Sequence, residues 1–70
     1  MAPVGVDRTI AANMLRLMEE RGWSQERLGH EAGMSSSTVN AIVDARRNPT
    51  LRTLRRLREA FGCTWDELLG

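Results

Sequence analysis

QERLGHEAGMSSSTVNAIVD, residues 25–44, is the stretch that decides the fold, and it predicts two short helices meeting at a sharp corner. Leu28 and Ala32, spaced i, i+4, give the first helix an apolar side. Gly33 follows at the position where a left-handed residue commonly ends a helix. Gly29 lies one position after Leu28, where two helices crossing at a steep angle would leave little room for a side chain. We therefore predict a helix over residues 25–32 that ends in a tight turn.

The second half of this stretch predicts a helix over residues 36–44. Ser35 is a good N-cap, and Val39 and Ile42, spaced i, i+3, are the expected inward residues. A helix, a short turn containing glycine and a second helix form the helix-turn-helix plan, in which the second helix enters the major groove of DNA.

Size and composition limit the possibilities further. Seventy residues, of which 41% are hydrophobic, make one small globular domain. There is no run of eighteen apolar residues and no basic-then-apolar leader, so we expect a cytoplasmic protein. The single cysteine, Cys63, is expected to be buried. The sequence has no cluster of Cys and His residues that would hold zinc, and we expect no cofactor.

The rest of the chain predicts three more helices around this centre. Residues 1–6 are expected to form a flexible arm, and residues 7–70 the folded domain. Asp7 is the expected cap of a helix over residues 8–21, with a buried stripe of Ile10, Met14 and Leu17. A helix from residue 51 to about 61 follows Thr50, with the inward leucines Leu51, Leu54 and Leu57. Thr64 and Glu67 form a capping box for a fifth, short helix. The predicted fold class is all-α.

Three segments resemble the helix-turn-helix domains of the phage repressor and Cro type, also called the XRE family. They are GWSQERLGHEAGMSSSTVNAIV, RRNPTLRTLRRL and FGCTWDELL, and the resemblance that rests on them runs from about Met14 to Leu69, nearly the whole chain. The resemblance implies a five-helix, lambda-repressor-like bundle that binds double-stranded DNA. It also implies pairing of two copies through the region of the fifth helix, which makes Trp65, Leu68 and Leu69 candidate dimer contacts.

Base contacts are expected from the outward side of the second helix of the motif. At 100° per residue, this side carries Ser37, Asn40 and Ala41, with Ser36 at the exposed N-terminal edge. Serine hydroxyls can donate or accept at base edges, Asn40 can pair with adenine, and Ala41 can contact a thymine methyl group. The resemblance implies the same role for Ser36, Ser37 and Ala41.

Phosphate contacts are expected on both sides of that helix. The resemblance implies Ser24 and Gln25 at the start of the preceding helix, and the loop residues Arg46, Arg47 and Asn48 after it. Thr50 begins a helix whose free N–H groups can hold a phosphate, with Arg52 close by. Ser35 is a further candidate, although a simple capping role is the plainer interpretation. Arg55, Arg56 and Arg58 lie deeper in a helix and are expected to form a solvated face.

Three positions depart from the resemblance. Relatives of this type often carry arginine and glutamate where this chain has Met18 and Val43, and the two apolar residues are therefore expected to touch. Asp44 would repel phosphate, unless it pairs with Arg46 or Arg47 or accepts from cytosine. Ala45 replaces a usual glycine; it either adopts a strained left-handed conformation or changes the exit of the helix.

The leading hypothesis is a sequence-specific transcriptional regulator that binds a palindromic operator as a homodimer. The alternative is a protein-interaction module on the same fold, such as an antitoxin or a partner-binding regulator. No nucleophile–base pair, carboxylate pair or phosphate-cradling loop is present in the sequence, so an enzyme is not expected.

Overall fold

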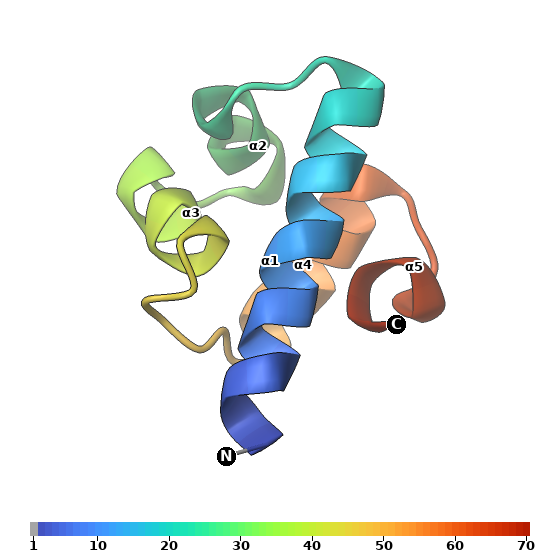
Figure 1. Cartoon of the computed structure of the whole chain (residues 1–70). Coiled ribbons are helices and arrows are strands. Elements are labelled where there is room, and N and C mark those ends of the chain that lie inside the picture. Colours follow the sequence, from blue (N-terminus) through green and yellow to red (C-terminus); the bar gives the residue numbers. More distant parts are fainter. Residues whose placement is uncertain (1) are drawn as a thin grey trace.

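The computed structural model describes the backbone of residues 2–70 and the side chains of residues 8–70. Within this range all the regular elements are helices and there are no strands, as predicted. Its elements are α1 (Ala2–Arg21), α2 (Gln25–Ala32), α3 (Ser36–Val43), α4 (Leu51–Phe61) and α5 (Trp65–Leu69). Figure 1 shows α1 running through the middle of the molecule, with α2 and α3 on one side, α5 on the other and α4 behind.

The predicted start of the first helix is wrong. α1 begins at Ala2, so the backbone of Asp7 lies inside the helix and is not its N-cap. Pro3 falls in the first turn, where its missing N–H is not needed, and Gly5 costs a helix only about 1 kcal/mol. Met1 lies outside the described residues, and the flexibility of the arm over residues 1–6 stays a prediction.

The other helix starts follow the sequence closely. In each case the side-chain oxygen of the cap accepts a hydrogen bond from the backbone N–H three residues later, at 3.1–3.2 Å. The four caps are Ser24, Ser35, Thr50 and Thr64. The carboxylate of Glu67 accepts in return from the backbone N–H of Thr64 at 2.9 Å, which completes the predicted capping box. Each cap contributes about 1 kcal/mol, and the short helices α2, α3 and α5 need that contribution.

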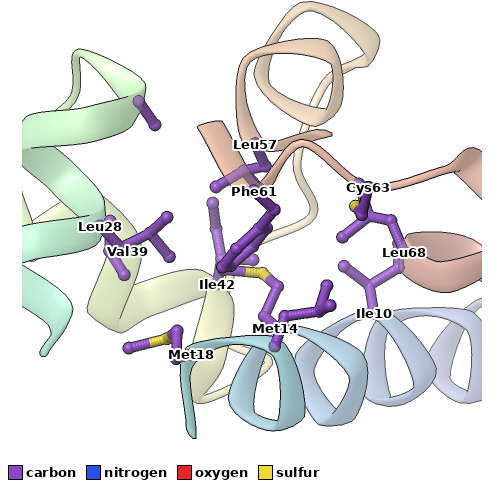
Figure 2. Packing of buried hydrophobic residues seen from close by; sticks show 12 residues of the cluster. Ile10, Met14, Met18, Leu28, Val39, Ile42, Leu57, Phe61, Cys63 and Leu68 are labelled. Carbon is purple, nitrogen blue, oxygen red and sulfur yellow. The ribbon is translucent and has the colours of Figure 1, made fainter. Parts of the chain in front are cut away.

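Every helix contributes side chains to one hydrophobic core (Figure 2). The predicted stripe of Ile10, Met14 and Leu17 on α1 is buried, with at most 4% of each residue exposed. Leu28 from α2 and Leu57 from α4 are completely buried against it. The core therefore holds α2 and α3 against α1 and α4, and fixes the position of the motif.

The interpretation of Leu51 as an inward residue is wrong. Leu51 is 65% exposed, whereas Leu54 is partly buried and Leu57 is completely buried. Leu51 occupies the first turn of α4. It has the i, i+3, i+6 spacing with Leu54 and Leu57, but it is not part of the hydrophobic core.

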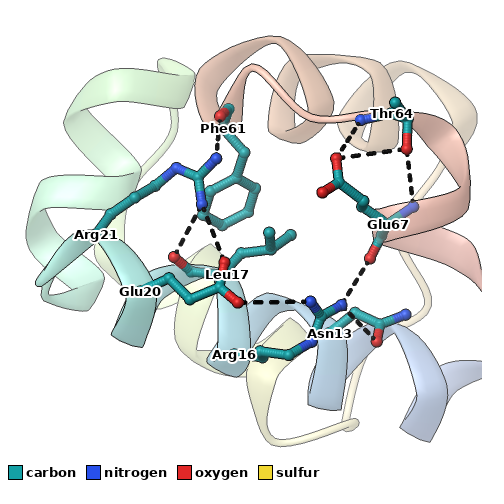
Figure 3. Close-up of polar contacts among 8 residues, drawn as sticks. All are labelled: Asn13, Arg16, Leu17, Glu20, Arg21, Phe61, Thr64 and Glu67. Atoms are coloured by element: carbon teal, nitrogen blue, oxygen red, sulfur yellow. Dashed lines mark hydrogen bonds and ion pairs between the residues drawn. The ribbon is translucent and has the colours of Figure 1, made fainter.

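Long polar side chains of α1 fasten the C-terminal third of the chain (Figure 3). The amide of Asn13 donates to the carbonyl of Leu68 at 2.8 Å, a bond that Figure 3 does not draw. Arg16 donates to the carbonyl of Glu67 at 3.0 Å. Arg21 donates to the carbonyl of Phe61 at 2.6 Å, at the end of α4. These bonds satisfy carbonyls that helix ends leave without partners. Arg16 and Arg21 thus have a structural role.

Candidate nucleic-acid interface

The corner between α2 and α3 brings two backbones into direct contact. Gly33 has φ of 71° and ends α2, and the backbone N–H of Met34 donates to the carbonyl of Gly29 at 2.8 Å. A Cβ atom added to Gly29 would lie 2.6 Å from the carbonyl oxygen of Met34. Close approach at Gly29 is therefore as predicted, and it sets how α3 leaves α2.

α3 turns one side inward and the opposite side outward. Val39 and Ile42 are buried, with 0% and 2% exposed. Ser36 and Ser37 are exposed, and Asn40 and Ala41 are half-buried at the edge of the outward side. This arrangement leaves the N-terminal half of α3 accessible, as entry into a groove requires.

The outward side of α3 faces a surface hollow of about 490 Å³, which we call the α2–α3 hollow. The hollow brings together all four predicted base contacts and two predicted phosphate contacts. Glu26 also lines it and was missed from the sequence, where it is one of several acids with no distinguishing pattern. Its lining residues are Gln25, Glu26, Ser36, Ser37, Asn40, Ala41 and Arg46.

A chain of polar contacts crosses this hollow. The side-chain Nδ2 of Asn40 donates to Oε1 of Gln25 at 2.9 Å, and Nη2 of Arg46 donates to Oδ1 of Asn40 at 2.8 Å. The same Nη2 lies 3.5 Å from Oδ2 of Asp44. Asp44 therefore pairs with Arg46, which is one of the roles predicted for it, and we call this series of contacts the Gln25–Asp44 relay.

The remaining predicted phosphate contacts do not line the hollow. The hydroxyls of Ser24, Ser35 and Thr50 accept the capping bonds of α2, α3 and α4, so each has an observed structural role. Ser35 and Thr50 also share a hydrogen bond with a threonine hydroxyl three residues on. Arg47, Asn48 and Arg52 are also exposed and lie outside the hollow.

Ala45 adopts the left-handed conformation, with φ of 58°, which decides between the two alternatives left open by the sequence. Its N–H donates to the carbonyl of Ile42 at 3.0 Å, and the N–H of Arg46 donates to the carbonyl of Ala41 at 2.9 Å. These two bonds form a Schellman turn, which ordinarily has glycine at the left-handed position. The turn determines where the loop carrying Arg46 begins.

We expect Ala45→Gly to raise the free energy of unfolding by about 0.5–1 kcal/mol. Glycine removes the strain of a Cβ atom at positive φ, which costs about 1 kcal/mol, and part of that gain is lost to the greater freedom of the unfolded chain. Urea denaturation would measure the difference. An Ala45→Gly chain less stable than the original would contradict the left-handed assignment.

The candidate dimer contacts on α5 are not equivalent. The assignment of Leu68 is wrong for this fold, because its side chain is completely buried in the chain's own core. Trp65 is 36% exposed beneath the guanidinium of Arg58, whose Cζ lies 5.0 Å from the ring centroid, and Leu69 is 42% exposed. Of the three candidate residues, only Trp65 and Leu69 expose apolar surface.

Other kinds of site find little support among the described residues. None of the helices there is both long and apolar enough to cross a membrane. The described side chains include no group of three or more His, Cys, Asp or Glu residues that could hold a metal ion. Cys63 is buried as predicted, and that burial, together with the charge of Glu67, raises the pKa of its thiol.

Comparison with known proteins agrees with this geometry. A model of the helix-turn-helix family matches residues 14–68. An uncharacterized HTH-type transcriptional regulator of Sinorhizobium fredii is 34% identical over 89% of this chain and 80% of its own length. A hypothetical transcription factor of Neisseria meningitidis is 32% identical over 86% of this chain, which spans only 57% of that relative.

No solved structure is significantly similar to the chain. The family match nevertheless contains both helices of the motif, the following loop, α4 and all but the last residue of α5. The predictions of the family and of a non-enzymatic domain are confirmed by this match and by the relatives named above. The chain therefore belongs to the helix-turn-helix family of the phage repressor and Cro type.

Proposed function

We propose that this chain is a DNA-binding transcriptional regulator whose helix α3 enters the major groove. The observation that carries the proposal is the α2–α3 hollow, which gathers Ser36, Ser37 and Ala41 beside Arg46 on one accessible side. Serine hydroxyls and an alanine methyl group at the N-terminal half of α3 are suited to base edges. The relatives' names, both of transcription regulators, support the same proposal.

Phosphate contacts would flank this base-reading side. Gln25 and Ser24 lie at the start of α2, and Arg46, Arg47 and Asn48 lie in the loop that follows α3. The start of α4 adds Thr50 and Arg52, at a helix end that attracts anions. The net charge of +1 is small, so attraction to DNA depends on this local grouping of arginines.

A homodimer on a palindromic operator is the finer part of the proposal. Two copies related by a two-fold axis would place their recognition helices about 34–36 Å apart, one turn of DNA. The exposed side chains of Trp65 and Leu69 offer the apolar surface that such a pairing needs. A cytoplasmic location belongs to the same proposal, because bacterial operators lie there.

The exposed side chains of Trp65 and Leu69 are also compatible with the alternative function, which is a module that binds another protein. Selection from random DNA, followed by titration of the selected and of a random duplex at two salt concentrations, separates the two functions. The proposal expects enrichment of a two-fold symmetric site and binding that weakens steeply with salt. A protein-interaction module would retain no duplex even at low salt.

Arg46→Ala is expected to weaken binding to all duplexes by a similar factor and to lower the salt slope by about one unit. The reason is that Arg46 is an exposed guanidinium beside the base-reading side, held there by Asn40 and Asp44. Arg55→Ala removes the same charge from the exposed surface of α4 and serves as the matched control. Equal slopes for the Arg46→Ala chain and the unaltered chain would count against a phosphate contact.

A further inference from the structure

The Gln25–Asp44 relay joins three separate elements at the outward side of α3. Gln25 begins α2, Asn40 lies within α3, and Arg46 belongs to the loop before α4. Asn40 is half-buried between the other two, and its two side-chain bonds are 2.9 and 2.8 Å long. Asn40 thus uses both the nitrogen and the oxygen of its side-chain amide in hydrogen bonds to other side chains. A residue that only faced solvent would not need these two bonds.

The chemistry of the relay fixes its direction. A guanidinium has five N–H donors and no acceptor, so the atom of Asn40 that meets Arg46 must be its oxygen. The nitrogen of Asn40 then donates to Gln25, and the atom of Gln25 that receives this bond must be its oxygen. The orientation of both amides, which is otherwise ambiguous, follows from the arginine at the end.

This direction leaves hydrogen-bond donors of Gln25 and of Arg46, on either side of Asn40, available for DNA. Among the described residues, Nε2 of Gln25 has no recorded acceptor, and Arg46 uses only Nη2 for Asn40 and Asp44. Nε and Nη1 of Arg46 thus have no recorded acceptor within the same part of the chain. Donors held in fixed positions on either side of α3 match a phosphate on either side of a groove.

From this arrangement we infer that Asn40 is a positioning residue, which orients Gln25 and Arg46 toward the DNA backbone and does not read a base. To grip adenine with both amide atoms, Asn40 would have to share or release both bonds of the relay. This inference replaces the sequence-based assignment of Asn40 as a base contact, and it rests on the proposed DNA-binding function.

The test is a pair of double-mutant cycles on the full chain, using a random-sequence duplex pool and the selected site. If Asn40 orients Arg46, Arg46→Ala should reduce the affinity for DNA less in an Asn40→Ala background than in the unaltered chain. The factor by which affinity falls should be about three-fold smaller or more. Arg47→Ala, an exposed arginine of the same loop without a bond to Asn40, is the matched control and should cause the same loss in both backgrounds. Asn40→Ala alone should weaken all duplexes alike.

Asn40→Asp separates the two halves of the relay. A carboxylate still accepts from Arg46, but it cannot donate to Gln25 at neutral pH. In an Asn40→Asp background, we expect residue 40 to remain coupled to Arg46 in the double-mutant cycle. The coupling between residue 40 and Gln25, measured with Gln25→Ala, should disappear. A residue needed only for folding would give no such division, and circular dichroism of each variant checks that the fold is kept.

Two results would overturn the inference. One is additive losses for Asn40→Ala and Arg46→Ala, and the other is a change of preference at a single base pair in Asn40→Ala, which is the mark of a base-reading residue. Failure of the unaltered chain to bind any duplex at low salt is a different result. It would remove the proposed function itself, together with the inference that rests on it.

Discussion

Gly29→Ala is expected to lower the melting temperature by about 10 °C or more, which corresponds to about 2 kcal/mol for a domain of this size. The added Cβ would lie 2.6 Å from the carbonyl oxygen of Met34, and this obstacle is backbone, which cannot rotate away. An ordinary helical glycine would instead gain about 1 kcal/mol from alanine. Thermal unfolding followed by circular dichroism measures the sign directly.

Gly33→Ala is the matched control for this prediction. Gly33 lies at the same corner with φ of 71°, but a Cβ atom there would meet nothing within 4 Å. Only the left-handed strain of about 1 kcal/mol remains, so its loss of stability should be the smaller of the two. Were Gly29→Ala more stable than the unaltered chain, the close approach of α2 and α3 would not exist as described.

Met18→Arg is expected to destabilise the fold by about 3–5 kcal/mol, because it would bury a charge without a partner. Met18 is 6% exposed in the core, and the partly buried Val43 packs against the same cluster. If the two residues touch, as the sequence predicts, adding Val43→Glu should recover 1 kcal/mol or more, in the range of coupling energies for contacting residues (about 0.5–3 kcal/mol). Urea denaturation of the two single variants and the double variant completes the cycle.

The control for that cycle lies one turn away on the same helix. Leu15 is 48% exposed, and Leu15→Arg should change stability by no more than about 0.5 kcal/mol. Strictly additive losses for Met18→Arg and Val43→Glu would show that residues 18 and 43 are not in contact. A chain that tolerates Met18→Arg by itself would mean that α1 and α3 separate easily.

Local sequence patterns were sufficient for most of this fold. The caps at Ser24, Ser35, Thr50 and Thr64 and the left-handed Gly33 depend only on neighbouring residues, and all appear where the sequence places them. The stripe on α1 is equally local, because a 3.6-residue period specifies one face.

Errors arose where the answer depends on distant parts of the chain. Leu51 and Leu68 both have apolar neighbours at helical spacing, yet Leu51 is 65% exposed and Leu68 is completely buried in the core. Nothing in the sequence says how far the core extends along α4 or α5. The true start of α1 is hard to predict because proline and glycine usually disfavour a helix, whereas the first turn of α1 tolerates Pro3.

The candidate site divides in the same way. Its outward residues on α3 follow from helix geometry alone, as the exposed Ser36 and Ser37 illustrate. The Gln25–Asp44 relay depends on the angle between α2 and α3 and on the left-handed turn at Ala45. These bring Asn40 within hydrogen-bonding distance of Gln25, which is 15 positions away in the sequence, and of Arg46, which is 6 positions away. The pattern of residues along the sequence contains neither the helix-crossing angle nor the conformation of this turn. For the same reason the sequence did not predict that Glu26 lines the hollow.

The most direct test of the whole account is a titration of the isotope-labelled chain with duplex DNA at low salt, in which the NMR resonances of the backbone and side-chain amides are monitored. The account predicts that the largest changes lie at Gln25, Ser36, Ser37, Ala41 and Arg46, which surround the α2–α3 hollow. Changes concentrated at Trp65 and Leu69 on α5, or an unchanged spectrum at every DNA concentration, would contradict it.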